Sequence, residues 1–88
     1  MKAIITVTAK DAKGIIAKVS AKVSEHEANI VDISQTVMGE YFAMIMLIEL
    51  DDKKNFSDLS DSLSALGREN NLDIHAMHED IFNSMHRI

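Results

Sequence analysis

The order of the hydrophobic periods along this chain limits its fold more than any other feature. Residues 2–9 and 29–38 alternate apolar and polar side chains and are rich in Ile, Val and Thr, which is typical of strands. Residues 14–26, between them, repeat apolar side chains at the spacing of an amphipathic helix, at Ile15, Ile16, Val19 and Val23. The first half of the chain is therefore predicted to be a strand, a helix and a strand.

The second half begins at a two-residue gap, Gly39-Glu40, which predicts a tight hairpin into a third strand. That strand, residues 41–50, is apolar on both faces, and a strand of this kind is expected to lie centrally in a sheet and to be covered on both sides, at least partly. A second helix is predicted from an N-cap at Ser57. Its apolar positions are Leu59, Leu63 and Leu66.

The end of the second helix carries two signals. Gly67 is predicted to interrupt the helix, and residues 70–71, both Asn, are predicted to end it. Residues 72–77 then read as a fourth strand. The last segment, residues 79–88, has Ile81, Met85 and Ile88 at helical spacing, but ten residues are too few to be helical alone. We expect a short C-terminal helix that docks on another surface.

This order of elements, βαββαβ, predicts an α+β, ferredoxin-like sandwich. Two interleaved right-handed βαβ crossovers give a four-stranded antiparallel sheet of order 2-3-1-4, with both long helices on one face. The chain of 88 residues is expected to form a single domain, with a core over residues 2–78 and an amphipathic tail over 79–88.

Composition and charge exclude several classes of function. The absence of cysteine excludes disulfides, thiolate metal sites and cysteine nucleophiles. The net charge of −5 and the scattered lysines argue against direct nucleic-acid binding. The longest apolar run, residues 41–48, is shorter than the ~20 residues of a membrane helix. The first residues do not resemble a signal peptide, so we expect a cytoplasmic protein that does not bind membranes.

No arrangement typical of an enzyme is visible. The acid pairs at 51–52 and 79–80 fall in predicted turns, and the serines lack the strained turn and paired base of a nucleophile. We therefore expect neither catalysis nor a cofactor or metal ion.

A candidate ligand site lies where the first strand turns into the first helix. A glycine there, Gly14, leaves room for a ligand at the backbone, and the amides of the helix's first turn favour a carboxylate. The plainer alternatives are that Gly14 serves only a tight turn, Asp11 a helix cap, and Asn29 a helix-to-strand turn.

The run DAKGIIAKVSAKVSEHEANIVDI, residues 11–33, resembles the signature of the ACT domain, a small module that binds amino acids. The matching pattern is an Asp, two residues, a Gly, an aliphatic pair, a helix and then Asn-Ile at the second strand. The resemblance covers residues 2 to 78. The C-terminal IFNSMHRI is similar to that of small stand-alone prokaryotic ACT proteins, which resemble the ACT halves of the glycine cleavage system transcriptional repressor.

The resemblance implies regulatory binding of a free amino acid at a subunit interface. By position, Asp11 and Asn29 would hold the ligand's polar groups. The carboxylate would be received by backbone amides of the turn that contains Ala12, namely those of Lys13, Gly14 and Ile15.

The positions of these residues in the first helix predict that one chain cannot complete the site. Gly14 and Asn29 are 15 residues apart, at opposite ends of the helix, which corresponds to ~20 Å. Pairing of the second, edge strand with its twin across a two-fold axis would bring Asn29 of one chain near the turn of the other. We expect a homodimer, or a higher oligomer, with the amino acid at its seam and a regulated protein partner. The alternative is a purely structural dimerisation module without a small-molecule ligand.

Overall fold

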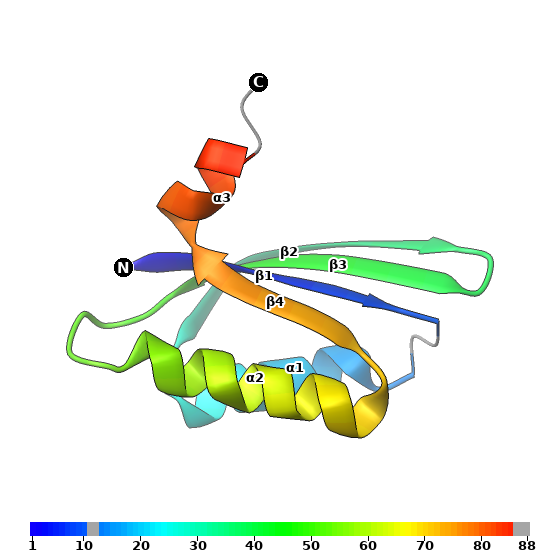
Figure 1. Ribbon diagram of the computed structural model, residues 1–88, viewed down its shortest axis with the longest axis horizontal. Coiled ribbons are helices and arrows are strands. Elements are labelled where there is room, and N and C mark those ends of the chain that lie inside the picture. Colours follow the sequence, from blue (N-terminus) through cyan, green and yellow to red (C-terminus); the bar gives the residue numbers. More distant parts are fainter. Residues whose placement is uncertain (11–12, 86–88) are drawn as a thin grey trace.

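The computed structural model describes residues 1–10 and 13–85, and its fold is the predicted one (Figure 1). The elements in chain order are β1 (Lys2–Ala9), α1 (Ile15–Glu25), β2 (Asn29–Met38), β3 (Tyr41–Glu49), α2 (Phe56–Asn70), β4 (Asp73–His78) and α3 (Glu79–Met85). The strands form one antiparallel sheet of order β2-β3-β1-β4, which confirms the predicted topology.

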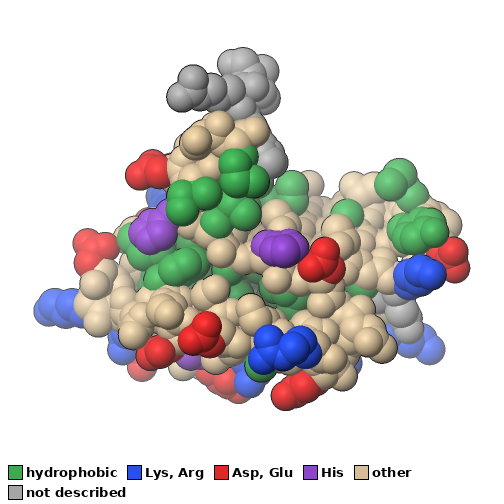
Figure 2. All heavy atoms as spheres, viewed as in Figure 1, with side chains coloured by type: hydrophobic (Ala, Val, Ile, Leu, Met, Phe, Trp, Pro, Cys, Tyr) green, Lys and Arg blue, Asp and Glu red, His purple; other side chains and the backbone are tan. Residues whose placement is uncertain are grey.

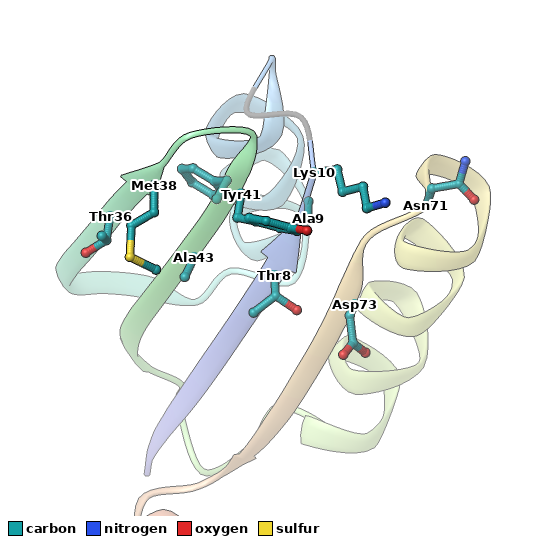
Figure 3. A pocket seen from close by; sticks show the side chains of 10 residues that line it. Thr8, Ala9, Lys10, Thr36, Met38, Tyr41, Ala43, Asn71 and Asp73 are labelled. Carbon is teal, nitrogen blue, oxygen red and sulfur yellow. The ribbon is translucent and has the colours of Figure 1, made fainter.

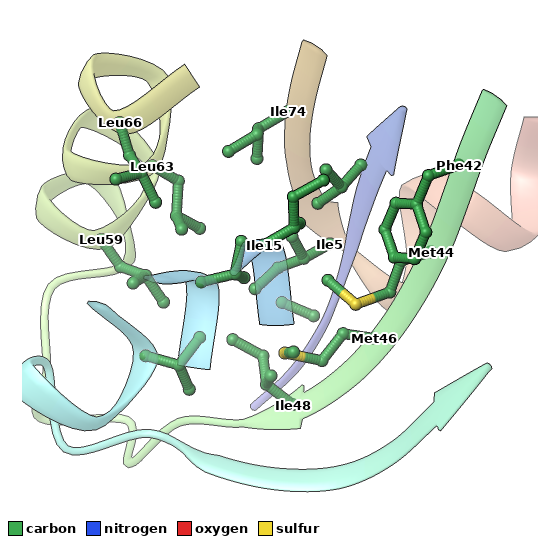
Figure 4. Close-up of a cluster of buried hydrophobic side chains, with 14 residues drawn as sticks. Ile5, Ile15, Phe42, Met44, Met46, Ile48, Leu59, Leu63, Leu66 and Ile74 are labelled. Carbon is green, nitrogen blue, oxygen red and sulfur yellow. The ribbon is translucent and has the colours of Figure 1, made fainter. Parts of the chain in front are cut away.

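The sheet separates two unequal layers. Helices α1 and α2 lie together against one face, and α3 stands on the other side of the sheet (Figure 1). The core lies between the sheet and the two long helices, and Figure 4 shows how side chains from both layers fill it. Its members are buried apolar residues such as Ile5, Val7, Met44, Met46, Val19, Leu59 and Leu63. The alternating apolar positions of β1 and β3 therefore face these helices.

We call the sheet face opposite α1 and α2 the open face. The strand register assigns rows of side chains to it: Thr36, Ala43, Thr8 and Asp73 form one row, and Ser34, Ile45, Thr6 and His75 form the next. Ala43 and Ile45 are exposed, so β3 is buried on one face only over much of its length. The apolar composition of β3 on both faces thus predicts its central position correctly, while its second face stays largely uncovered.

β2 is the edge strand next to β3, and it is exposed almost throughout. Even on the side of the long helices, Ile33 is 36% and Val37 63% exposed, because α1 and α2 do not extend under this part of the sheet. A register shift between Ile30 and Asp32 places a bulge near the start of the strand. The outer edge of β2 therefore remains available for pairing.

Three local predictions need correction. The N-cap of α2 is Asn55, whose side-chain oxygen accepts a hydrogen bond from the Ser57 amide at 2.9 Å, so Ser57 is not the cap. α2 continues through Gly67 and ends before Asn71, which has a left-handed backbone (φ 56°).

On α1, Ile16 is 38% exposed and does not belong to the core, whereas Ile15, Val19 and Val23 do. The predicted contribution of Ile88 to the tail lies outside the described residues.

Candidate functional site

The turn between β1 and α1 presents an exposed glycine directly before the helix. Gly14 has φ 68° and ψ 5°, a left-handed conformation in which a side chain is strained. Among the described residues, a Cβ added to Gly14 would meet only the Cε atom of Lys18, at 4.0 Å, so these residues leave the space beside this backbone open. Lys13 is exposed in the same turn, and the predicted site residues Asp11 and Ala12 lie outside the described part of the chain.

The first turn of α1 offers amide groups for which the helix itself has no acceptors. The helical hydrogen bonds begin with the Lys18 amide, which donates to the Gly14 carbonyl at 3.0 Å. Within the described residues no side chain caps this end, and the first turn holds no acidic residue. The side chain of Ile15 is only 2% exposed and belongs to the core, so a ligand could use its backbone amide alone. The local positive potential and the open space favour a small anion.

Asn29 lies at the other end of the sheet from this turn. It pairs with Glu49, which in turn pairs with Lys2, whereas the β1–α1 turn follows Ala9. Lys2 and Ala9 are seven positions apart, which corresponds to ~23 Å at ~3.3 Å per residue. The structure thus brings together Lys13, Gly14 and Ile15 and leaves Asn29 apart from them within one chain.

A hollow of about 540 Å³ opens on the open face, at the end of β1 (Figure 3). The side chain of Tyr41 extends over Ala9, and Lys10 lies between this ring and Asn71 (Figure 3). The other lining residues are Thr8, Thr36, Met38, Phe42, Ala43 and Asp73. The volume is within the range of ligand pockets, but Met38 and Tyr41 are 66% and 55% exposed, so the hollow is wide open.

Sequence reasoning did not find this hollow, because its walls come from strands and turns that are distant in the chain. One signal was available: the residues that flank the hairpin turn, Met38 and Tyr41, are both large and largely apolar. Large apolar side chains at a hairpin end often point to a surface that is covered in an assembly.

Polar contacts near the C-terminal end of α1 link this helix to α2 and to the turn that precedes α2. The Lys54 ammonium lies 2.6 Å from a carboxylate oxygen of Glu27, and this hydrogen-bonded ion pair raises the pKa of Lys54 above 10.5. Nε2 of His26 lies 3.0 Å from Oγ of Ser62, which links α1 to α2. These contacts hold α1 against α2 and against the turn that precedes α2.

The described residues contain neither a metal-binding cluster nor a membrane-spanning helix. Residues 1–10 and 13–85 contain no group of three or more His, Asp or Glu side chains placed to hold a metal ion. The same residues include no helix of the length and hydropathy needed to cross a membrane.

Comparison with known proteins places the fold in a family. Residues 2–77 match the family model of the ACT domain. A UPF0237 protein of Clostridium perfringens is 49% identical over 89 residues, which cover 100% of both chains. The solved structure of an ACT domain protein from Streptococcus pneumoniae has a TM-score of 0.83 and 45% identity, over 98% of each chain. A structure described as a glycine cleavage system transcriptional repressor has a TM-score of 0.77 and 26% identity, over 86% of this chain and 44% of that one. The chain therefore belongs to the ACT-domain family.

Proposed function

We propose that the protein is a small regulatory module that binds a free amino acid, or a similar small carboxylate, between two copies of the chain and thereby modulates a partner protein. The observation that carries this proposal is the backbone at Gly14. It is left-handed, exposed and open, and it directly precedes helix amides that have no acceptor within α1. A ligand carboxylate fits these amides because they supply hydrogen-bond donors and the positive end of the helix dipole.

The second copy supplies what one chain lacks. Asn29 lies ~23 Å from the β1–α1 turn along the sheet, which is too far for one amino acid to contact both. The exposed edge of β2 can pair antiparallel with the same strand of another copy across a two-fold axis. That arrangement supports a site in which Asn29 of one chain and the Gly14 turn of the other enclose the ligand. Asp11 would accept the ligand's ammonium group, as the resemblance to other ACT domains implies.

The decisive experiment measures thermal unfolding in the presence of each of the twenty amino acids, with Gly14→Ala and Gly39→Ala as matched variants. Both glycines have left-handed backbones (φ 68° and 60°), and neither Cβ would meet an atom closer than 4.0 Å. Both variants should lose ~1 kcal/mol of stability from backbone strain. Only Gly14→Ala should also lose the ligand response, because its methyl group stands where the carboxylate approaches.

In the wild type, an amino acid at ~100 times its Kd should add ~2.7 kcal/mol to the free energy of unfolding. An equal ligand response in both variants would contradict the site at Gly14. A stable oligomer without any response to amino acids at millimolar concentration would favour the purely structural dimerisation module.

A further inference from the structure

The open face of the sheet has a raised end and a hollow end. α3 contacts β1 and β4 at the end where His78 pairs with Ala3. Ile4 points to the open face at this end and is only 8% exposed. At the other end lies the hollow of about 540 Å³ beside Thr8 and Ala43. Figure 2 shows the molecule dipping between α3 and the β2–β3 hairpin.

α3 carries apolar surface that the described part of the chain leaves uncovered. Phe82 is half-buried, whereas Ile81 and Met85 are 52% and 61% exposed. Being four residues apart, Ile81 and Met85 lie along one stripe of the helix. A helix of seven residues gains little stability from its own hydrogen bonds, so packing must hold it in place. An apolar stripe on its outer side indicates that a second surface covers it.

We propose that this second surface is the open face of another copy of the chain. A two-fold axis across the two open faces would place the Ile81–Met85 stripe of each chain in the hollow beside Ala43 of the other. The raised part and the hollow part belong to one surface, which is the self-complementarity that a two-fold interface requires. Two copies would thus cover both α3 stripes and both hollows at once.

The dimensions agree with this arrangement. β1 has eight residues and is ~26 Å long, so two helices, each ~10–12 Å in diameter, fit side by side along it. The molecule measures 39 × 33 × 20 Å. Since the layers stack along the intermediate axis in Figure 1, the open face spans at most 39 by 20 Å. A face of this size has an area on the order of 800 Å², which is one partner's share of a standard interface.

Charged side chains of opposite sign lie at the two ends of the open face, and the hollow also holds Asp73, whose carboxylate lies 3.0 Å from Nε2 of His75. α3 begins with Glu79 and Asp80, and Lys10 lies at the hollow. Within the described part of the chain, none of these three side chains takes part in an ion pair. The two-fold arrangement brings the acidic turn of α3 to the end of the sheet that carries Lys10 of the partner subunit.

This interface is separate from the edge pairing on which the proposed function depends. Edge pairing uses the backbone of β2, and the face interface uses α3 and the open side of the sheet. Both can form in one assembly of four chains with two kinds of two-fold axis. Loss of one interface therefore leaves the other to be measured.

The test follows the mass of the protein by analytical ultracentrifugation over a range of concentrations. Met85→Glu puts a charge on the α3 stripe, and Ala43→Arg fills the hollow. Each variant should raise the dissociation constant of one association step more than tenfold and halve the limiting mass. Ser64→Glu adds the same charge at an exposed position of α2, behind the opposite face, and should leave the mass unchanged. Circular dichroism of each variant checks that the monomer is folded.

Mixing the two variants gives the sharpest result. In a mixed pair, the intact α3 of the Ala43→Arg chain meets the intact hollow of the Met85→Glu chain, and the new Arg and Glu face each other at the second contact. The mixture should therefore regain the association step that each variant alone has lost, and with it the full limiting mass. A wild type that is monomeric at every concentration overturns the proposal, as does an unchanged mass of Met85→Glu. If Ala43→Arg abolishes an amino-acid response while Met85→Glu keeps the wild-type mass, the hollow holds a small molecule and the proposal is wrong.

Discussion

Gly67 lies where the backbone that follows α2 passes directly against the helix. In the sequence it stands near the end of a predicted helix and looks like an interruption. In the structure α2 passes through it, and a Cβ there would lie 2.6 Å from the carbonyl oxygen of Leu72. The Leu72 amide donates to the Gly67 carbonyl at 2.9 Å, so the chain returns directly against the helix at this point. The glycine is required for close backbone approach, since no other residue leaves that space.

Gly67→Ala tests this requirement. Alanine favours a helix over glycine by about 1 kcal/mol, but here its methyl group meets a backbone atom that cannot rotate away. We expect a net loss of ~1–3 kcal/mol in the free energy of unfolding, measured by urea denaturation. Ser64→Ala, at an exposed position of the same helix, should be neutral or slightly stabilising. A Gly67→Ala variant at least as stable as the wild type would contradict the close approach.

At the scale of elements, the N-cap of α2 lies two residues before Ser57, the cap that the sequence predicts. Asn55 and Ser57 are two residues apart, and both types are favoured N-caps. The backbone of Asn55 is extended (φ −89°, ψ 106°), and its side chain accepts the Ser57 amide at 2.9 Å. Which of these two residues caps α2 depends on where β3 ends and on the path of the turn that connects β3 to α2.

The two candidates for the cap can be separated by alanine substitution. Asn55→Ala should cost about 1 kcal/mol in the free energy of unfolding, because an amide of the first turn loses its acceptor. Ser57→Ala should change the stability by a few tenths of a kcal/mol at most. Chemical denaturation of both variants measures the difference, and a larger loss for Ser57→Ala would contradict the assignment.

At the scale of the whole molecule, two surfaces remain uncovered in a single chain: the edge of β2 and the open face with α3. The first supports the ligand site that we propose, and the second supports a face-to-face contact. They can be told apart because Ile33 lies midway between Asn29 and Val37 on the edge strand, far from α3. In a two-fold pairing of β2 with itself, Ile33 lies close to its own twin.

Ile33→Lys should therefore weaken edge pairing, because it places two like charges near each other at the axis. Ile33 is 36% exposed, so the monomer should tolerate the change. Ultracentrifugation should show a reduced limiting mass, and thermal unfolding should no longer respond to the amino acid. Met85→Glu serves as the control, since it should lower the mass and keep the ligand response. A ligand response that survives Ile33→Lys would mean that one chain binds the amino acid without edge pairing.

The sequence by itself determined the order of the elements, the strand order and the exact limits of β1 and β2, because alternation and helical spacing are local properties of the chain. It also singled out the turn at Gly14, through the resemblance of residues 11–33 to the ACT signature. Only the tertiary structure decided that α2 runs through Gly67, that β2 is almost bare on both faces, and that a hollow lies beside Ala43. These features depend on which distant segments of the chain approach each other. Packing of the whole chain decides this, and a local sequence pattern does not predict it.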